Sequence, residues 1–336
     1  MSGTVLVTAG GPGVTLQDAG RAGQTGFGLS RGGASDPMAL IEAEALLGAS
    51  AADVCIEISG MGARFQVTTP TRIALTGATA KASIDKRDIK GFVTELLLPG
   101  QTLAVGPIID GVYCYLSFAG GLNVPLRMGG RGAHLLGRIG QHLKDGDTLG
   151  LGGDPAPDSP ARKLDPDRTS IGPVRVMPGP QTELFDETVR QRFQATEFTR
   201  SARGNRQGVR MDHDGEGFAT ADQLALVSDF ISEGDIQMTG DGRPFVLLSE
   251  HQTTGGYPRI GTVIPADLPR VAQAVPGTKL TFQLISLQDA EAAWRSKADI
   301  LKRLKSRCSA LVRDPRDIPE LMSMNLISGV VSGRES

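Results

Sequence analysis

Apolar residues occur in short runs along most of the chain, and Gly, Pro, Asp or Thr bounds most of these runs. Between residues 54 and 151 the runs recur about every ten residues, which is typical of a β-barrel or a β-sandwich. The predicted strands of the first half are 5–7, 54–58, 63–67, 71–75, 94–98, 102–105, 112–119 and one that ends near 151. Those of the second half are 174–177, 208–211, 225–227, 236–238, 244–248, 260–264 and 279–285. The pattern therefore predicts a mainly β protein with a few short helices.

Helical spacing is confined to four segments. Ser35-Asp36-Pro37 supplies an N-cap and a first-turn proline, and strong helix formers follow from 38 to 47 before Gly48 closes the helix. Residues 182–193 have helically spaced apolar positions, and 267–274 predict a short helix or a turn. Residues 287–308 predict one long helix, because apolar positions recur every three or four residues, with acidic residues early and basic residues late.

A stretch rich in Pro and Asp separates the two sets of strands. Such a composition is typical of a boundary between units. We therefore expect an N-terminal β unit at 1–152, a linker at 153–173, a second β unit at 174–286, and a C-terminal helix and tail at 287–336. The apolar positions at 321–331 predict that the tail packs back on the protein.

Composition narrows the class of protein. The 336 residues are 40% hydrophobic and 21% charged, which is typical of a globular chain. Thirty-five basic residues against 37 acidic residues leave no basic surplus for nucleic acid or for an acidic membrane surface. The three cysteines are too few and too far apart for a disulfide framework, and no CxxC pair predicts a zinc site. With neither a signal peptide nor an apolar membrane span, the expected location is a reducing cytoplasm.

The richest candidate for chemistry is the loop Gln252-Thr253-Thr254-Gly255-Gly256-Tyr257-Pro258. It is longer than a tight hairpin turn requires, and its adjacent glycines permit a close approach to a ligand. An amide, two hydroxyls and a phenol surround the glycines. We expect the loop to contact a substrate; the alternative is a purely structural Ω-loop.

Two further glycine-rich clusters carry charged side chains. Asp18 and Arg21 predict an ion pair, or an Arg21 fork onto a carboxylate ligand; a structural pair is an equal alternative. Arg131, flanked by glycines, is a candidate for anion binding, and His134 is a weaker candidate for proton transfer. The alternative is a glycine bend with a surface arginine and a structural histidine.

The remaining chemical patterns are weaker. Asp212, His213 and Asp214 suggest a charged histidine or a metal site, but strand alternation places the histidine on the opposite face from both carboxylates. A solvated turn is therefore favoured there. Gly28-Leu29-Ser30-Arg31-Gly32 matches GxSxG without the flanking strand and helix of a nucleophile elbow, and we interpret that match as chance.

Five motifs, taken in their order along the chain, resemble one family. They are Gln17-Asp18-x-Gly20-Arg21, Gly33-x-x-Asp36-Pro37-x-Ala39-Leu40, Ala74-Leu75-Thr76-Gly77-Ala78, Tyr115-Leu116-x-Phe118-Ala119-Gly120-Gly121 and Gln252-Thr253-Thr254-Gly255-Gly256-Tyr257-Pro258. The set resembles the allophanate hydrolase subunit 2 family, also named the biotin-dependent carboxyltransferase-like family, which includes the C subunit of 5-oxoprolinase and the KipA group. The resemblance covers about residues 4 to 290.

The resemblance implies two β-barrel units of cyclophilin-like type and an activity within a complex. That activity is a biotin-dependent carboxyltransferase or an ATP-dependent 5-oxoprolinase acting on a small amide or lactam. Biotin would be presented by a separate carrier and ATP used by a partner. The implied partners are a subunit-1 or KipI-like protein, and a biotin carboxylase with its biotin carrier or a LamB/YcsF-type protein. The alternative is a non-catalytic, KipA-like regulatory protein that binds a KipI-like partner.

The resemblance also implies roles for residues. Arg21 and Arg131 would bind anionic groups, and the loop would hold substrate through Gln252, Thr253 and Tyr257, with Gly255 and Gly256 allowing close approach. The candidates for the catalytic base are Asp18, Asp36 and His213. The sequence departs from the family at two places: the usual Gly-Ser-Arg-Ser-Thr is Gly-Gly-Arg-Gly-Ala at 129–133, and the usual Arg-Met-Gly-Tyr-Arg-Leu is Arg-Met-Asp-His-Asp-Gly at 210–215. These departures leave the identity of the substrate open.

Overall fold

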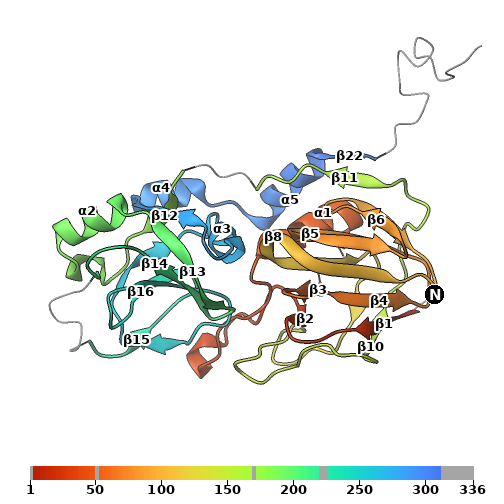
Figure 1. Ribbon diagram of the computed structural model, residues 1–336, viewed down its shortest axis with the longest axis horizontal. Coiled ribbons are helices and arrows are strands. Elements are labelled where there is room, and N and C mark those ends of the chain that lie inside the picture. Colours follow the sequence, from red (N-terminus) through yellow and green to blue (C-terminus); the bar gives the residue numbers. More distant parts are fainter. Residues whose placement is uncertain (1–2, 50–52, 169–171, 219–225, 312–336) are drawn as a thin grey trace, which may run out of the picture.

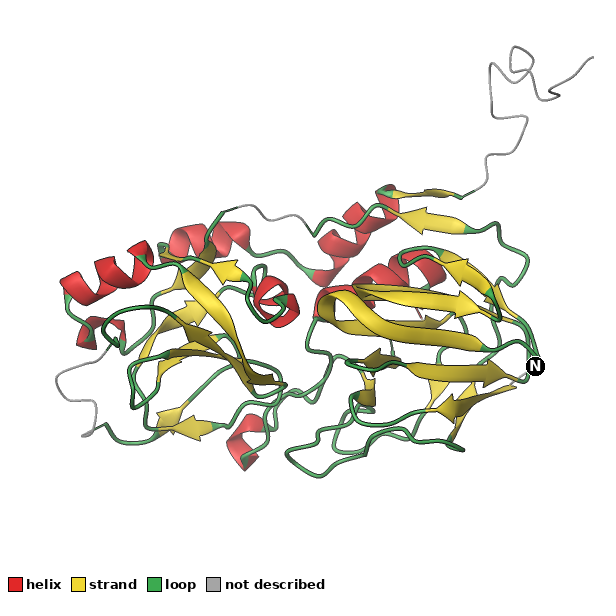
Figure 2. Cartoon of the chain, in the orientation of Figure 1, coloured by secondary structure: helices red, strands yellow, loops and turns green. Residues whose placement is uncertain are grey.

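The structure is a computed structural model that describes residues 3–49, 53–168, 172–218 and 226–311. Two β-rich units lie side by side, one built from the first half of the chain and one mainly from the second (Figure 1). Most helices lie along one side of the two sheets, the upper side in Figure 2. The prediction of a mainly β protein with few helices is confirmed.

Ten strands form one sheet in the N-terminal half of the described residues. They are β1 (Gly3–Ala9), β2 (Val14–Gln17), β3 (Cys55–Ile58), β4 (Ala63–Val67), β5 (Thr71–Ile84), β6 (Arg87–Ile89), β7 (Thr94–Leu97), β8 (Leu103–Phe118), β9 (Leu122–Asn123) and β10 (Thr148–Leu151). The order is β2-β3-β8-β4-β1-β10-β9, and β5 pairs with β6, β7 and β8. Apolar side chains from most of these strands fill the interior, among them Val5, Ile56, Phe65, Leu116 and Phe118.

The long strand β8 holds this sheet together. It pairs with β4 near its start, with β3 near its end, and with β5 along most of its length. The sequence predicts two strands here, 102–105 and 112–119, and the structure has one. The intervening residues stay paired with β5 through register shifts, as in the pairs Thr79↔Asp110 and Ala80↔Ile108. Bulges of this kind bend a strand without ending it.

Eight strands form the second sheet within the described ranges. They are β12 (Val174–Met177), β13 (Phe198–Asn205), β14 (Gly208–Asp212), β16 (Asp235–Met238), β17 (Pro244–Leu247), β19 (Arg259–Val263), β20 (Lys279–Leu280) and β21 (Phe282–Leu284), in the order β20-β13-β14-β17-β16-β19-β12-β21. A separate pair joins β15 (Asp229–Phe230) to β18 (Thr254–Gly255). The core includes a cluster of phenylalanines, in which the ring centroid of Phe193 lies 5.2 Å from that of Phe198 and 5.5 Å from that of Phe282.

Short helices accompany both sheets. They are the 3₁₀ turns η1 (Thr25–Phe27) and η3 (Thr182–Leu184), and the helices α1 (Pro37–Leu47), α2 (Glu187–Ala195), α3 (Leu268–Gln273), α4 (Leu287–Ala293) and α5 (Lys297–Ser306). Helix α1 begins and ends as predicted, because Asp36 accepts a hydrogen bond from Met38 N (3.1 Å) and Gly48 follows the last turn at φ 105°.

The prediction of one helix over 287–308 is wrong, because the structure has two. Ser286 caps α4 by accepting from Asp289 N, and Ser296 caps α5 by accepting from Asp299 N, both at 3.1 Å. Each serine also binds its aspartate side chain at 2.6 Å. The repeated Ser-x-x-Asp pattern therefore starts a second helix where apolar periodicity alone predicts continuity.

Other boundaries also differ from the predictions. The expected linker at 153–173 contains β11 (Arg162–Leu164), which pairs with β22 (Cys308–Ala310) at the far end of the described chain. The predicted strand at 225–227 is absent at 226 and 227, and residue 225 lies outside the described residues. The helix expected at 182–193 divides into η3 and α2, and the strand expected at 279–285 divides into β20 and β21. The apolar tail at 321–331 lies outside the described residues.

Candidate functional site

Arg206 joins the two units through a buried charge network. It lies in the turn between β13 and β14, and its guanidinium donates to the carboxylates of Glu57 and Glu250, the latter at 2.7 Å. It also donates to Ser35 Oγ at 2.9 Å. Glu57 and Glu250 are each 2% exposed. Burial opposes the charge on Arg206, but the two carboxylates outweigh it and raise the pKa of Arg206 above its ordinary value.

The carboxylate of Glu250 is held ionised by the same contacts. Burial by itself raises a carboxyl pKa, but Arg206 and the hydrogen bond donated by Leu136 N (3.0 Å) bring the pKa of Glu250 below its ordinary value. The sequence patterns do not predict this network. The available signal is Glu57, a charged residue inside the apolar strand Cys-Ile-Glu-Ile.

Two of the predicted clusters, Gln17–Arg21 and 129–134, are in direct contact. The carboxylate of Asp18 accepts from Gly20 N (2.8 Å) and from Arg131 N (2.6 Å). Arg21 Nε donates to Arg127 O (3.0 Å). The predicted ion pair between Asp18 and Arg21 is not found within ion-pair distance in the described chain, because each side chain binds backbone of the 127–132 segment instead.

Arg21 retains unused hydrogen-bonding capacity. Its Nη2 donates to Gly132 O, while its Nη1 is buried without a hydrogen-bond partner among the described residues. The side chain is among the most deeply buried of the protein, and burial lowers the pKa of Arg21, although Asp18 and Glu250 oppose the shift. A Cβ at Gly132 would lie 2.9 Å from Asp18 Oδ1. The glycine therefore lets this segment close on Asp18.

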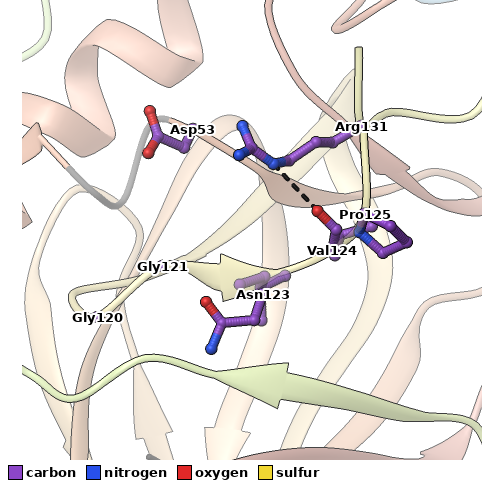
Figure 3. Close-up of a pocket in the computed structure, with 8 residues that line it drawn as sticks. Asp53, Gly120, Gly121, Asn123, Val124, Pro125 and Arg131 are labelled. Carbon is purple, nitrogen blue, oxygen red and sulfur yellow. Dashed lines mark hydrogen bonds between the residues drawn. The ribbon is translucent and has the colours of Figure 1, made fainter. Parts of the chain in front are cut away.

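Arg131 opens onto a polar pocket of about 530 Å³ (Figure 3). Its lining residues are Asp53, Gly120, Gly121, Leu122, Asn123, Val124, Pro125 and Arg131. Arg131 Nε donates to Val124 O (3.0 Å), which fixes the guanidinium plane. Figure 3 shows the Asp53 carboxylate on the same side of the pocket as the guanidinium, with Asn123 projecting from β9. The pocket thus combines cationic, anionic and amide groups. We name it the Arg131 pocket.

His134 is buried between the units. Its Nδ1 accepts from Gly137 N (3.0 Å), so in the neutral ring Nε2 carries the proton and donates to Ser30 Oγ (3.0 Å). Burial lowers the pKa of His134 and favours this neutral form. The ring therefore cannot take a proton from Ser30, and the GxSxG match has no base beside its serine. Glu250 Oε2 lies 3.9 Å from Nδ1.

The loop Gln252–Pro258 lies on the C-terminal unit. Strand β18 pairs with β15, and Thr253 O accepts from Ile231 N (3.1 Å). Gln252 and Thr254 are exposed, and Tyr257 is 46% exposed, whereas Thr253 is buried. A Cβ at Gly255 would lie 2.7 Å from Gln237 Nε2, so this glycine allows the loop to pack on β16.

The loop connects to the N-terminal unit through its neighbours. Gly32 N donates to Ser249 O (2.9 Å), and Arg31 pairs with Glu233 (2.7 Å). These contacts bring the segment around Arg21 against the segment that leads into the loop. The loop itself is not part of the lining of the Arg131 pocket.

Asp36 and His213 lie elsewhere. Asp36 is fully buried; besides capping α1 it accepts from Arg168 Nη1 (2.6 Å) and Gln273 Nε2 (2.8 Å). His213 Nδ1 donates to Asp214 O (2.9 Å), and its ring packs against Phe198 and Phe218. Burial lowers the pKa of His213. Both residues have structural partners, and neither lines the Arg131 pocket.

Neither a cluster of metal ligands nor a membrane-spanning helix occurs in the described ranges. These ranges contain no group of three or more His, Cys, Asp or Glu residues arranged to hold a metal ion. The helices found there are all too short or too polar to span a lipid bilayer.

Comparison with known proteins extends this picture. The family model described as "Carboxyltransferase domain, subdomain A and B" matches residues 27–284. The C subunit of 5-oxoprolinase from Escherichia coli (strain K12) is 32% identical over 297 residues, which cover 87% of this chain and 95% of that protein. The urea amidolyase of Saccharomyces cerevisiae is 26% identical over 326 residues, which cover 89% of this chain and 18% of that protein.

A solved structure agrees with the fold. The crystal structure of the K. lactis urea amidolyase superimposes with a TM-score of 0.77 at 25% identity, covering 90% of this chain and 20% of that chain. The chain therefore spans nearly all of one relative and about a fifth of the other two. The expected two-barrel architecture is confirmed by this likeness.

Proposed function

Because the chain belongs to the family of carboxyltransferase domains with subdomains A and B, we propose that it is one subunit of a multi-component enzyme acting on a small amide. Relatives named as the C subunit of 5-oxoprolinase and as urea amidolyase support a 5-oxoproline-like lactam or a urea-like substrate. Both substrate types share one feature, a carbonyl group next to an N–H group. The recognition chemistry is therefore the same for both.

The observation that carries this proposal is the set of groups around the Arg131 pocket. A guanidinium donates to a carbonyl oxygen, and a carboxylate accepts from an N–H group. Arg131 and Asp53 provide these two functions, and Asn123 provides both. The volume of about 530 Å³ lies within the usual range of small-molecule sites. Asp18 and Arg21 act as positioning residues, because they hold the backbone on which Arg131 stands.

The exposed polar groups of the Gln252–Pro258 loop supply the second part of the proposed site. Gln252 and Tyr257 are exposed, and they are free to contact a substrate or a partner protein. Thr253, Gly255 and Gly256 set the path of the loop. Because the loop and the Arg131 pocket stand on different units, the complete site would include both units and a partner chain.

The proposed complex contains a subunit-1 or KipI-like partner, and ATP is used by a partner. In the carboxyltransferase form, biotin on a separate carrier would supply the activated carboxyl group, and a biotin carboxylase would load it. In the 5-oxoprolinase form, a LamB/YcsF-type protein takes that place. This chain's own part is to bind the amide, orient it and exclude water. The free thiols of Cys55, Cys114 and Cys308 agree with a cytoplasmic location.

The test is turnover of 5-oxoproline and of urea by the reconstituted complex with ATP. Arg131→Gln removes a charge-assisted hydrogen bond of about 1.5–3 kcal/mol, so kcat/KM should fall about 10- to 100-fold. Asp53→Asn should have an effect of similar size, and Arg64→Gln, on the exposed face of β4, is the matched control. Tight partner binding with no turnover in either component set would favour the KipA-like regulatory alternative. Unchanged kinetics in Arg131→Gln would remove the pocket from the site.

A further inference from the structure

A second and larger cleft lies between the two units. Its volume is about 690 Å³, and none of its lining residues lines the Arg131 pocket. Its walls are α3 and the segment before it, the junction of α4 and α5, and parts of β5 and β8. The proposed amide chemistry makes no use of this cleft. We name it the Trp294 cleft.

The junction of α4 and α5 shapes one wall. Because Ser296 starts a new helix, the chain turns after Ala293 and presents Trp294 and Arg295 to the cleft. Arg295 Nη1 holds this turn by donating to Ala292 O and to Trp294 O (2.7 Å). Trp294 is 62% exposed, although tryptophan is usually well buried. A large exposed ring inside a cleft offers a surface for stacking.

The arginines that line the cleft differ in their carboxylate partners. Arg168 pairs with Asp36 and Glu42, Arg175 pairs with Asp267, and Arg303 pairs with Asp167. Arg270 donates to the carbonyls of Gly172 (2.7 Å) and Pro173 (3.3 Å), and its distance to Asp267 is 4.0 Å. The contacts that the described residues make with the Arg295 guanidinium are to carbonyls alone. Among the described residues, Arg295 thus has no carboxylate partner and Arg270 has one at 4.0 Å, while the exposed carboxylate Asp110 lies on the β8 wall.

The lining also includes apolar residues, among them Met38, Ile300, Pro265 and Pro269. We propose that the Trp294 cleft binds a small anion that carries a planar aromatic ring. The ring stacks on Trp294, and the anionic group is held by Arg270 and Arg295. A planar ring stacks favourably on an aromatic side chain, and a guanidinium adds a charge-assisted hydrogen bond to the anionic group.

A ligand in the Trp294 cleft would lie beside a contact that joins the two units. Gln273, which lines the cleft, accepts from Val112 N (2.8 Å) and Tyr113 N (3.0 Å), and donates to Asp36 Oδ2 (2.8 Å) and Tyr113 O (2.9 Å). One side chain of the second unit therefore makes four hydrogen bonds to the first. A ligand that spans the cleft would contact both sides of this joint.

The chain offers a direct probe, because Trp294 is its single tryptophan. Intrinsic tryptophan emission of the full-length protein should change saturably on titration with AMP or with benzoate, and calorimetry should give the same Kd. Adenosine, which lacks the anion, and inorganic phosphate, which lacks the ring, should each bind at least tenfold more weakly than AMP. No saturable signal with either AMP or benzoate in the millimolar range, by emission and by calorimetry, overturns the proposal.

Variants assign the two parts of the ligand. Arg295→Gln should weaken AMP binding about tenfold while leaving adenosine unchanged, and Trp294→Phe should retain binding by calorimetry where Trp294→Ala loses it. Lys302→Gln, an exposed change on α5 outside the lining, is the control. Arg131→Gln should leave AMP binding unaltered, so this proposal and the proposed amide site can fail independently. AMP binding that is equal in Arg295→Gln and wild type would overturn the assignment of the anion.

Discussion

Replacing Arg206 by methionine tests whether the buried charge network joins the two units. The substitution keeps much of the volume and removes the charge. It leaves Glu57 and Glu250, each 2% exposed, without their cationic partner. Breaking a buried ion pair by removing one partner costs about 3–5 kcal/mol, because an uncompensated charge stays in the interior. The hydrogen bonds to Ser35 and Gly33 are lost as well.

The measurement is urea unfolding of wild type and variant at pH 7. With an m-value of about 3 kcal/mol/M, a loss of 3–5 kcal/mol lowers the unfolding midpoint by about 1–2 M. Arg210→Met is the matched control. Arg210 also pairs with two carboxylates, Asp212 and Asp241, each at 2.8 Å. These two carboxylates are 47% and 52% exposed. Exposed pairs contribute about 0–1 kcal/mol, so the control midpoint should stay close to that of wild type.

The pH dependence gives a second readout. In the wild-type protein the lowered pKa of Glu250 stabilises the fold above its unfolded-state pKa, and this contribution is lost as pH falls through the folded-state value. Without Arg206, burial raises the carboxyl pKa, and the resulting penalty is relieved as pH falls. The difference in stability should therefore shrink from pH 7 towards pH 5. A loss no larger than that of Arg210→Met, or one that grows on acidification, would refute the reasoning.

Two further predictions concern neighbouring features. Burial lowers the pKa of His134, so its neutral form contributes stability that is present above about pH 6.5 and lost as pH falls. In urea unfolding between pH 7 and pH 5, the stability of His134→Gln should therefore decline less than that of wild type. An equal decline would contradict the assignment. Ser296→Ala removes the cap of α5, which should lower the free energy of unfolding by about 1 kcal/mol and red-shift or broaden the emission of Trp294. The control Ser232→Ala lies outside both helices and should leave the emission unchanged. A Ser296→Ala spectrum identical to that of wild type would count against the cap.

Local signals in the sequence predict part of the fold. Helix α1 is predicted at both ends, because its cap, its first-turn proline and its closing glycine all lie within the segment itself. The length of β8 is not predictable in this way. Its middle residues have no strand pattern, and they remain extended because β5 pairs with them from across the sheet. The break between α4 and α5 also has a local signal, the cap at Ser296. The prediction misses it because the apolar periodicity continues across the break.

The candidate site, like the fold, is predictable from the sequence only in part. The sequence places Asp18 and Arg21 in one cluster and Arg131 in another, and the structure adds the contact between the two clusters, which depends on pairing of distant segments. Arg206 lies in an ordinary turn and has no local signature, since its partners are 149 and 44 residues away along the chain. Asp36 has a strong local signature, but that signature is the helix cap rather than chemistry. A sequence motif can therefore identify a residue, but the residue's role follows from its contacts in the fold.

The pairing of β11 with β22 has a consequence for how the chain can be divided. Residues 297–310 return to the first unit: α5 packs Leu304 against Leu46 and Leu47 of α1, and β22 extends the edge of β11 (Figure 1). The first unit is thus discontinuous in sequence, and the second is an insertion between its pieces. A fragment ending at residue 286 should expose the apolar face of α1 and aggregate. A deletion variant that joins 297–311 directly to the N-terminal unit should keep this face covered.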